Sequence, residues 1–131
     1  VIVVEYSQTN AQRIKDMGLA TDVIVADATN VMDVYHKVMA ITGGRGCDVT
    51  VNNVNVPSTE MTSILVTKGR GSVYFFSMAT SFTKAALGAE GVGKDINLIV
   101  GNGFAKGHAN LTLNIIRESQ PIRELFEKLY V

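Results

Sequence analysis

Apolar, β-branched residues gather in short runs along the chain, and more polar, helix-forming segments separate these runs. In "VIVVE" (1–5) and "DVIVAD" (22–27) the apolar positions are continuous and do not alternate with polar ones. Continuous runs of this length indicate strands that are buried on both faces between layers of helices. The same reading gives further strands at "DVTVNNV" (48–54), "SVYFFS" (72–77) and "INLIV" (96–100).

Residues that favour the formation and capping of helices occupy most of the segments between these apolar runs. Ser7 or Thr9 can cap a helix over residues 8–17, which Gly18 ends, and Thr29 or Asn30 can cap a second helix that runs to about Ile41. A third helix is expected from Pro57, in its first turn, to about residue 67, before a turn at "KGRG" (68–71). The segment "AALGAEGVG" (85–93) reads as flexible, and residues 109–130 read as helix with a break before Pro121.

Strands that alternate with helices predict an α/β fold, a doubly wound parallel sheet with right-handed crossovers. Ligands of such sheets bind outside the carboxyl ends of the strands. The glycines of "TGGRG" (42–46) precede a strand, so Gly43, Gly44 and Gly46 are expected to end a helix and turn the chain. Asn53, Val54 and Asn55, at the other end of that strand, are the better candidates for a ligand site.

Glu5 ends the first strand, where the dinucleotide-binding fold places a carboxylate that accepts hydrogen bonds from the adenosine ribose. An exposed strand-end acid is the alternative interpretation. In that fold another strand and a G-x-G-x-x-G turn come before this acid. If Glu5 binds ribose, the chain therefore starts one strand too late.

A second glycine-rich segment, "GNGFAKG" (101–107), follows a strand and precedes a helix. This context can hold a pyrophosphate at a helix N-terminus. The next strand, which should supply a ribose acid about 20 residues later, is not predicted, so a phosphate loop is disfavoured. The segment can instead line the nicotinamide side of a cleft, with His108 as a polar residue beside it.

Composition excludes several classes of partner and site. The 131 residues fit about one domain, and 12 basic and 12 acidic residues give a net charge of zero, which argues against nucleic acid and anionic membranes as partners. One cysteine, Cys47, makes no internal disulfide and completes no metal site, so it reads as a small core residue. No run reaches the roughly 18 residues of a membrane span, and a cytoplasmic protein is expected. His36, Lys84 and Lys94 read as helix or surface residues.

Three other functions compete with dinucleotide-dependent oxidation. Short-chain reductases need a Tyr-x-x-x-Lys pair, and none of the four tyrosines has a lysine four residues later. Methyltransferases that use S-adenosylmethionine also carry a strand-end acid, but they close the sheet with a late antiparallel strand, whereas this chain ends in predicted helix. The third alternative, a regulatory domain that binds a nucleotide and catalyses no reaction, is not excluded by the sequence.

The strings "VIVVEYS", "RIKDMGLATDVIVADAT", "ITGGRGCDVTVNNVN" and "LVTKGRGSVYFFS" resemble the cofactor domain of medium-chain, alcohol-dehydrogenase-like enzymes, from its second strand onward. More narrowly, "NVPSTEM", "VYFFSMATSFTKAALGAEGVGKDI" and "GNGFAKGHANLTLNIIRES" resemble the C-terminal part of dehydrogenases that deaminate a diamino acid in lysine fermentation. The resemblance implies a Rossmann-like domain and oxidation of 3,5-diaminohexanoate at carbon 3, which releases ammonia and reduces a nicotinamide cofactor.

The resemblance also implies roles for particular residues. Glu5 would meet the adenosine ribose, Asp27 and Ala28 would border the adenine, and the path to the nicotinamide would be lined by Asn53, Val54, Asn55, Ser77, Met78 and Ala79. A carboxylate at the ribose repels a 2′-phosphate, which favours NAD over NADP.

The expected domain organisation is a partial dinucleotide-binding domain over residues 1–131. The first strand, its glycine loop and the N-terminal catalytic domain would lie outside the chain, so this polypeptide alone is expected to be inactive. The pattern assigns no catalytic residue. The apolar "VYFFSMA" and the helical tail can supply the interface of a homo-oligomer.

Overall fold

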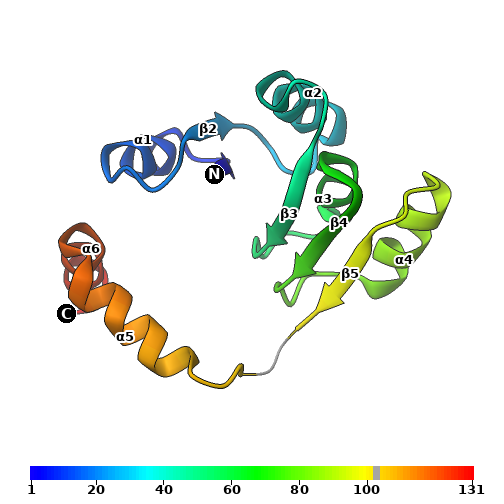
Figure 1. Ribbon diagram of the computed structural model, residues 1–131. Helices are drawn as coiled ribbons and strands as arrows, with labels where there is room; N and C mark the ends of the chain where they lie inside the picture. The colour runs from blue at the N-terminus through cyan, green and yellow to red at the C-terminus, as the bar shows by residue number, and fades with distance from the viewer. Residues whose placement is uncertain (102–103) are drawn as a thin grey trace. The chain divides into compact units, whose positions relative to one another are not determined.

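The computed structural model describes residues 1–101 and 104–131, which belong to two compact units, Val1–Gly101 and Asn102–Val131. The first unit alternates strands with helices, and the second contains two consecutive helices (Figure 1). In order, the first unit has β1 (Ile2–Glu5), α1 (Gln8–Asp16), β2 (Asp22–Val25), α2 (Val31–Thr42), β3 (Cys47–Asn52), α3 (Glu60–Val66), β4 (Thr67–Phe75), α4 (Phe82–Gly91) and β5 (Asn97–Val100). The second has α5 (His108–Glu118) and α6 (Gln120–Tyr130).

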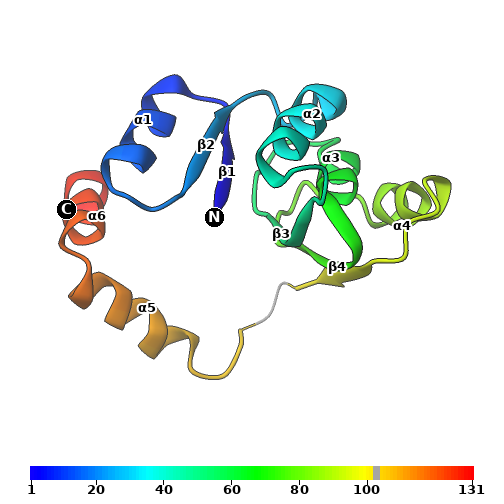
Figure 2. The same cartoon turned by 45° about the horizontal axis from the view of Figure 1, so that its top comes forward.

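All strand pairs in the described part of the chain are parallel, which confirms the predicted α/β class. They form two sheets, β1-β2 and β3-β4-β5, and Figure 2 shows the β1–β2 pair and the β3–β4 pair as separate groups. Glu5 pairs with Val25 in the first sheet. In the second sheet Asn52 pairs with Phe75, which pairs with Val100. The carboxyl ends within each sheet therefore lie at one edge.

Two apolar clusters form the core of the first unit. Ile24 and Ala26, at and just after β2, pack with Val34 and Val38 of α2, and Val66 of α3 joins them. Cys47 packs against this cluster from β3, and Ile2 and Val4 do so from β1. Because the cluster contains residues of both sheets, α2 and α3 hold the sheets together without strand pairing between them.

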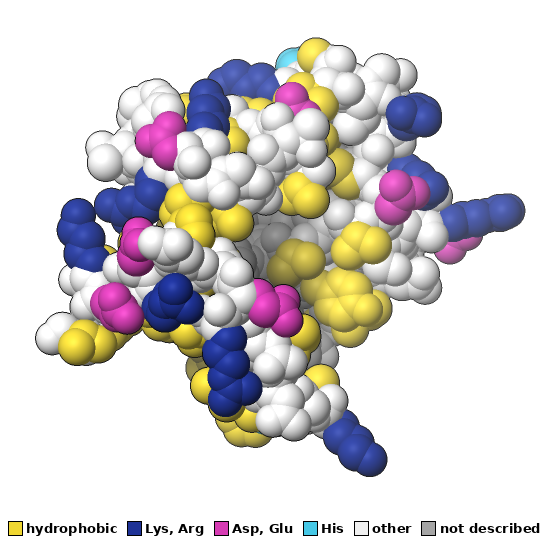
Figure 3. Space-filling view, turned by 60° about the vertical axis from the view of Figure 1, so that its left-hand side comes forward, with side chains coloured by type: hydrophobic (Ala, Val, Ile, Leu, Met, Phe, Trp, Pro, Cys, Tyr) yellow, Lys and Arg dark blue, Asp and Glu magenta, His cyan; other side chains and the backbone are white. Residues whose placement is uncertain are grey.

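The second cluster covers one face of β3-β4-β5. Val73 and Phe75 of β4 pack with Ile64 of α3 and Ala85 of α4. The opposite face carries a row of paired residues, Val51, Tyr74 and Ile99, which are 60%, 42% and 36% exposed. Apolar side chains also appear among charged ones on the face shown in Figure 3. One face of this sheet is thus packed, and the other presents apolar side chains to solvent.

The helix ends largely follow the local signals. Ser7 caps α1 by accepting a hydrogen bond from the N–H of Asn10, and Asn30 caps α2 through the N–H of Asp33. Gly43 ends α2 in the left-handed conformation with φ 62°, as predicted. The glycines of "TGGRG" therefore terminate a helix and turn the chain, and this prediction is confirmed.

Three local predictions were wrong. Helix α3 begins at Glu60 with Thr59 as its N-cap, so Pro57 lies in the preceding loop, next to Ser58 with φ 68°. Residues 68–71 belong to β4, where the pairing with β3 shifts register between Cys47 and Val49. Most of the segment 85–93, read as flexible, lies in helix α4, because Ser81 caps it and Ala85 is buried against the sheet.

The second unit contains two amphipathic helices without buried residues. Helix α5 ends at Glu118 and α6 starts at Gln120, with Pro121 in the first turn of α6. The break therefore falls where Pro121 was expected to place it. Within the described residues, no helix is long and apolar enough to cross a membrane.

Candidate functional site

The carboxyl ends of β1 and β2 carry the first candidates, Glu5 and Asp27. Glu5 is the last residue of β1 and is partly buried, and its carboxylate accepts a hydrogen bond from the N–H of Ser7 at 2.8 Å. Because an ionised carboxylate has about four lone-pair sites, Glu5 can accept further hydrogen bonds from a ligand hydroxyl. Glu5 and Asp27 lie at the same edge, since Glu5 pairs with Val25.

Asp27 is exposed, and it organises the turn after β2. Its Oδ1 atom accepts hydrogen bonds from the hydroxyl of Thr29 at 2.7 Å and from the N–H of Thr29 at 2.8 Å. The hydroxyl, followed by the N–H, holds the pKa of the Asp27 carboxyl below its usual range. Ala28, the next residue, accepts a hydrogen bond through its carbonyl from the hydroxyl of Thr62 at 2.7 Å. This bond ties the turn after β2 to helix α3.

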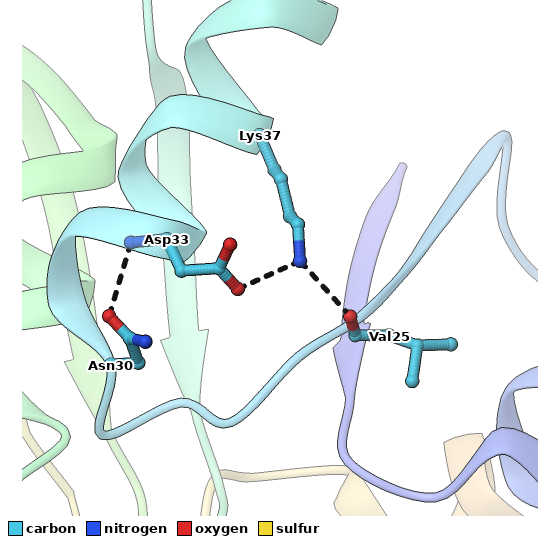
Figure 4. Close-up of polar contacts among 4 residues, drawn as sticks. All are labelled: Val25, Asn30, Asp33 and Lys37. Atoms are coloured by element: carbon cyan, nitrogen blue, oxygen red, sulfur yellow. Dashed lines mark hydrogen bonds and ion pairs between the residues drawn. The ribbon is translucent and has the colours of Figure 1, made fainter.

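The start of α2 is held against β2 by one lysine. Lys37 Nζ lies 2.7 Å from the carboxylate of Asp33, one turn earlier on the helix, and 3.4 Å from the carbonyl of Val25 (Figure 4). Asn30 caps the same helix through the N–H of Asp33 (Figure 4). Together these contacts fix the segment that carries Asp27 and Ala28.

The end of β3 carries a buried amide that the sequence did not single out. Asn52 is 6% exposed, and its Nδ2 donates to the hydroxyl of Thr59 at 2.9 Å and to that of Ser63 at 3.0 Å. Both hydroxyls donate onward to backbone carbonyls, so they act as acceptors toward Asn52. This arrangement leaves Asn52 Oδ1 buried without a donor among the described residues. The predicted residues Asn53, Val54 and Asn55 follow in an exposed loop.

The end of β4 carries Ser77, Met78 and Ala79. Ser77 Oγ accepts a hydrogen bond from the N–H of Ala79 at 3.1 Å, while the side chain of Met78 is 92% exposed. Glu60, at the start of α3, is 2% exposed and accepts a hydrogen bond from the N–H of Ser81 at 2.6 Å. Sequence reasoning missed Glu60 because nothing local in the pattern shows that its partner lies 21 positions away.

One cavity of about 1320 Å³ brings most of these elements together. From the predicted set it is lined by Glu5, Asp27, Ala28, Asn53 and Val54, and Asn52 also lines it. Asn55, Ser77, Met78 and Ala79 are not among its lining residues. The structure thus gathers the candidates that follow β1, β2 and β3 around one space, and it leaves those that follow β4 outside it.

The remaining candidates, Cys47 and Lys94, interact with other parts of the fold. Cys47 is partly buried, and desolvation first, then the Asp48 carboxylate, raises the pKa of its thiol. Lys94 Nζ donates to the carbonyls of Ile64 and Leu65 at the end of α3, and partial burial lowers its pKa. Lys94 therefore secures the end of α3, which is more than the expected surface role.

Of the two histidines, His36 lies exposed on α2. His108 begins α5, where its ring stacks on Phe104 at 4.8 Å and its Nδ1 lies 2.8 Å from the carbonyl of Ala105. Within the "GNGFAKG" segment, residues 102 and 103 lie outside the described residues. Across the part of the chain that the structure describes, no group of three His, Cys, Asp or Glu residues is arranged to hold a metal ion.

Comparison with known proteins connects this geometry with one enzyme. The chain is 51% identical over 125 residues to L-erythro-3,5-diaminohexanoate dehydrogenase of Acetoanaerobium sticklandii, and 52% identical over 120 residues to that of Fusobacterium nucleatum. The chain is a close homologue of part of this dehydrogenase. The matches cover 95% and 92% of the chain but only 36% and 34% of the two relatives. No family model matches the chain.

Solved structures agree on the fold. 2R,3R-butanediol dehydrogenase from Bacillus subtilis aligns with a TM-score of 0.62 and 21% identity, over 89% of this chain and 32% of its own. A mycobacterial quinone oxidoreductase aligns with a TM-score of 0.60 and 23% identity, over 77% of this chain and 30% of its own. At these identities the likeness establishes the fold, which is that of the Rossmann-like domain in medium-chain dehydrogenases and reductases.

Proposed function

We propose that residues 1–131 form the cofactor-binding part of an oxidoreductase that oxidatively deaminates L-erythro-3,5-diaminohexanoate to 5-amino-3-oxohexanoate. The observation that carries this proposal is the identity of 51% over 95% of the chain to the dehydrogenase of that name. At this identity the matched regions are expected to share one fold. The position of the enzyme in lysine fermentation rests on the same relationship.

The cofactor in this proposal is a nicotinamide dinucleotide, with NAD preferred over NADP. A bound nicotinamide would supply the acceptor for a hydride from the carbon that bears the amine. Glu5 fits the role of the ribose acceptor because it lies at the carboxyl end of a parallel strand and keeps acceptor capacity beyond its bond to Ser7. Its negative charge opposes a 2′-phosphate in the same place.

The other predicted residues have roles around that position. Asp27 and Ala28 would border the adenine, and their turn is held in place by Thr29 and Thr62. The path toward the nicotinamide would be lined by Asn53, Val54, Asn55, Ser77, Met78 and Ala79, which follow β3 and β4 at one edge of their sheet. These side chains and backbone groups orient the cofactor and exclude water, while no residue of this chain is assigned the proton transfers.

The overall reaction consumes the diamino acid, one oxidised cofactor and one water, and it releases the ketone, ammonia, the reduced cofactor and one proton. Oxidation removes a hydride and a proton from the carbon–nitrogen unit to give an imine, and water then replaces the nitrogen. We propose that groups outside residues 1–131 complete the active site, because the relatives are about three times as long as the matched region. The proposal also includes that the enzyme is cytoplasmic and that it forms a homo-oligomer.

Titration of the full-length protein with NADH, NADPH and S-adenosylmethionine tests this proposal. NADH is expected to bind most tightly, with a rise in its fluorescence, and oxidation of the diamino acid should release ammonia together with NADH. Binding of S-adenosylmethionine alone would favour a methyltransferase. NADH binding without oxidation of the diamino acid would favour another medium-chain dehydrogenase or a regulatory nucleotide-binding domain.

A further inference from the structure

Two exposed polar residues, Ser58 and Lys84, meet at the carboxyl edge of β3 and β4. Lys84 Nζ donates a hydrogen bond to Ser58 Oγ at 2.9 Å, across 26 positions of sequence. Ser58 lies in the loop between β3 and α3, and Lys84 lies in the first turn of α4, which follows β4. Figures 1 and 2 show α3 and α4 side by side. The pair therefore connects the segments that leave two neighbouring parallel strands.

The backbone on both sides of this contact is held in place. Ser58 has φ 68°, a conformation that residues other than glycine rarely adopt, and the hydroxyl of its neighbour Thr59 accepts a hydrogen bond from the buried amide of Asn52. The N–H of Lys84 donates to the hydroxyl of Ser81, which caps α4. The two side chains are thus presented from fixed segments.

The pair has donors left for an anion. An ammonium group has three N–H donors, and Ser58 takes one of those of Lys84. The Ser58 hydroxyl accepts this bond and donates to no group among the described residues. The ion pairs found in the part of the chain that the structure describes do not include Lys84. An N–H of Lys84 and the O–H of Ser58 are therefore available together to a ligand with two acceptor oxygens.

The charge of Lys84 does not help α4 to fold. The amino end of a helix carries a partial positive charge, so a cation in the first turn is disfavoured. The first turn of α4 contains no acidic residue that would offset Lys84. A residue that breaks a local rule without a compensating contact is typical of a functional position.

Among the reactants of the proposed reaction, the carboxylate of the diamino acid fits this pair best. Hydride leaves carbon 3, and the carboxylate is only two bonds away, so it must lie close to the nicotinamide. Ser77, Met78 and Ala79, which we propose to border the nicotinamide, directly precede α4. The other anion is the pyrophosphate of the cofactor, which the dinucleotide-binding fold holds at the glycine turn of its first strand. Ser58 and Lys84 follow β3 and β4 instead.

We propose that Lys84 and Ser58 bind the carboxylate of the substrate and thereby select carbon 3 for oxidation. One carboxylate oxygen accepts a hydrogen bond from Lys84 Nζ, and the other accepts one from the Ser58 hydroxyl. Carbon 5 is four bonds from the carboxylate, so this anchor keeps it away from the nicotinamide. The positive charge of Lys84 also repels both ammonium groups of the substrate from this end. The inference rests on the proposed function and adds the residues that determine which amine is oxidised.

Kinetics of the full-length protein with a matched pair of substrates test this contact. The second substrate is 3,5-diaminohexanamide, which lacks the negative charge of the acid. In the wild type the amide should have a KM about tenfold higher than the acid, which corresponds to one charged hydrogen bond. Lys84→Gln should raise KM for the acid about tenfold with little change in kcat, and it should leave KM for the amide unchanged, because the charge that the amide lacks no longer has a partner.

Three further variants separate charge, hydroxyl and general effects. Lys84→Arg keeps the charge and should stay within about threefold of the wild type, and Ser58→Ala should raise KM for the acid about threefold. Lys15→Gln removes an exposed lysine of α1 and should change neither KM. Equal increases in KM for acid and amide in Lys84→Gln would overturn carboxylate binding by Lys84.

The affinity for NADH, measured by fluorescence without substrate, distinguishes the two possible anions. It should be the same in the wild type and in Lys84→Gln, which also shows that the variant is folded. A loss of NADH affinity that matches the rise in KM would assign the pair to a cofactor phosphate and overturn the proposal.

The position of oxidation gives a readout that a structural role would not change. The wild type should form 5-amino-3-oxohexanoate, and Lys84→Gln should also form 3-amino-5-oxohexanoate, which mass spectrometry of the fragmented products identifies. Oxidation at carbon 3 alone in Lys84→Gln would overturn the selection of carbon 3. A wild type that oxidises neither carbon would overturn the proposed function and this inference with it, whereas an active wild type with the contrary results above would overturn the inference alone.

Discussion

The side-chain carboxyl of Glu60 accepts a hydrogen bond of 2.6 Å from the backbone N–H of Ser81, and the two residues lie at the N-terminal ends of consecutive helices. Glu60 lies in the first turn of α3, and Ser81 is the N-cap of α4. Glu60 is 2% exposed, so a buried side chain holds the segment between β4 and α4 in place. This segment carries Ser77, Met78 and Ala79, which we propose to border the nicotinamide.

Replacing Glu60 by alanine should destabilise the protein. The N–H of Ser81 would lose its side-chain acceptor in a partly buried place, which costs about 1 to 3 kcal/mol. Glu60→Gln keeps an acceptor oxygen and should cost less. Urea unfolding measures both, with Glu90→Ala on the exposed part of α4 as the control. Equal stability of Glu60→Ala and the control would contradict the role of this bond.

Replacing Glu5 by alanine should narrow the preference for NAD over NADP. Removal of the carboxylate abolishes both the ribose acceptor and the repulsion of a 2′-phosphate, so the ratio of the two affinities should fall about tenfold, or about 1.4 kcal/mol. Titration of the full-length protein with NADH and NADPH measures the ratio. Asp22→Ala, at the opposite end of β2, is the control, and an unchanged ratio in Glu5→Ala would rule out ribose binding by Glu5.

Replacing Thr29 by valine should raise the pKa of the Asp27 carboxyl toward its ordinary value. The Thr29 hydroxyl is the largest cause of the lowered pKa, because it donates to the ionised form. A carboxyl with a lowered folded pKa favours folding above its unfolded pKa of about 3.8, and this contribution is lost as the pH falls through the folded value.

Nuclear magnetic resonance titration of the aspartate carboxyl carbons checks the Thr29→Val prediction. The pKa of Asp48, which the ion pair with Lys68 lowers, should stay where it is and serves as the internal reference. A shift of both carboxyls would indicate a global change in structure. If neither pKa changes, the hydrogen bond from the N–H of Thr29 is sufficient to lower the pKa of Asp27.

Alanine at Gly46 should destabilise the chain more than alanine at Gly44. Both glycines have positive φ, 75° and 78°, so each substitution carries the left-handed penalty of about 1 to 2 kcal/mol. At Gly46 the added Cβ would also lie 2.8 Å from the carbonyl of Val66, whereas at Gly44 it meets nothing within 4 Å. Thermal or urea unfolding of the two variants measures the difference, and a smaller loss for Gly46→Ala would contradict the close approach of β3 to the end of α3.

Local signals predicted much of the fold because they act over a few residues. Ser7 and Asn30 cap their helices, Gly43 ends α2, and Pro121 marks the break between α5 and α6. Helix α4 was missed because its two glycines, Gly88 and Gly91, lower the intrinsic helix propensity. Burial of Ala85 and Gly88 against Ile64 and the N-cap at Ser81 outweigh that cost.

The sequence by itself determined the alternation of strands and helices, their parallel direction and the edge at which Glu5, Asp27 and Asn53 lie. The hydrophobic pattern and the residues at the end of each strand give this information, because both involve residues that are close together along the chain. Only the tertiary structure decided that Glu60 contacts Ser81, and that among the described residues the strands form two separate sheets and Asn52 Oδ1 has no donor. These features depend on contacts between residues far apart along the chain, whose formation is decided by packing of the whole unit.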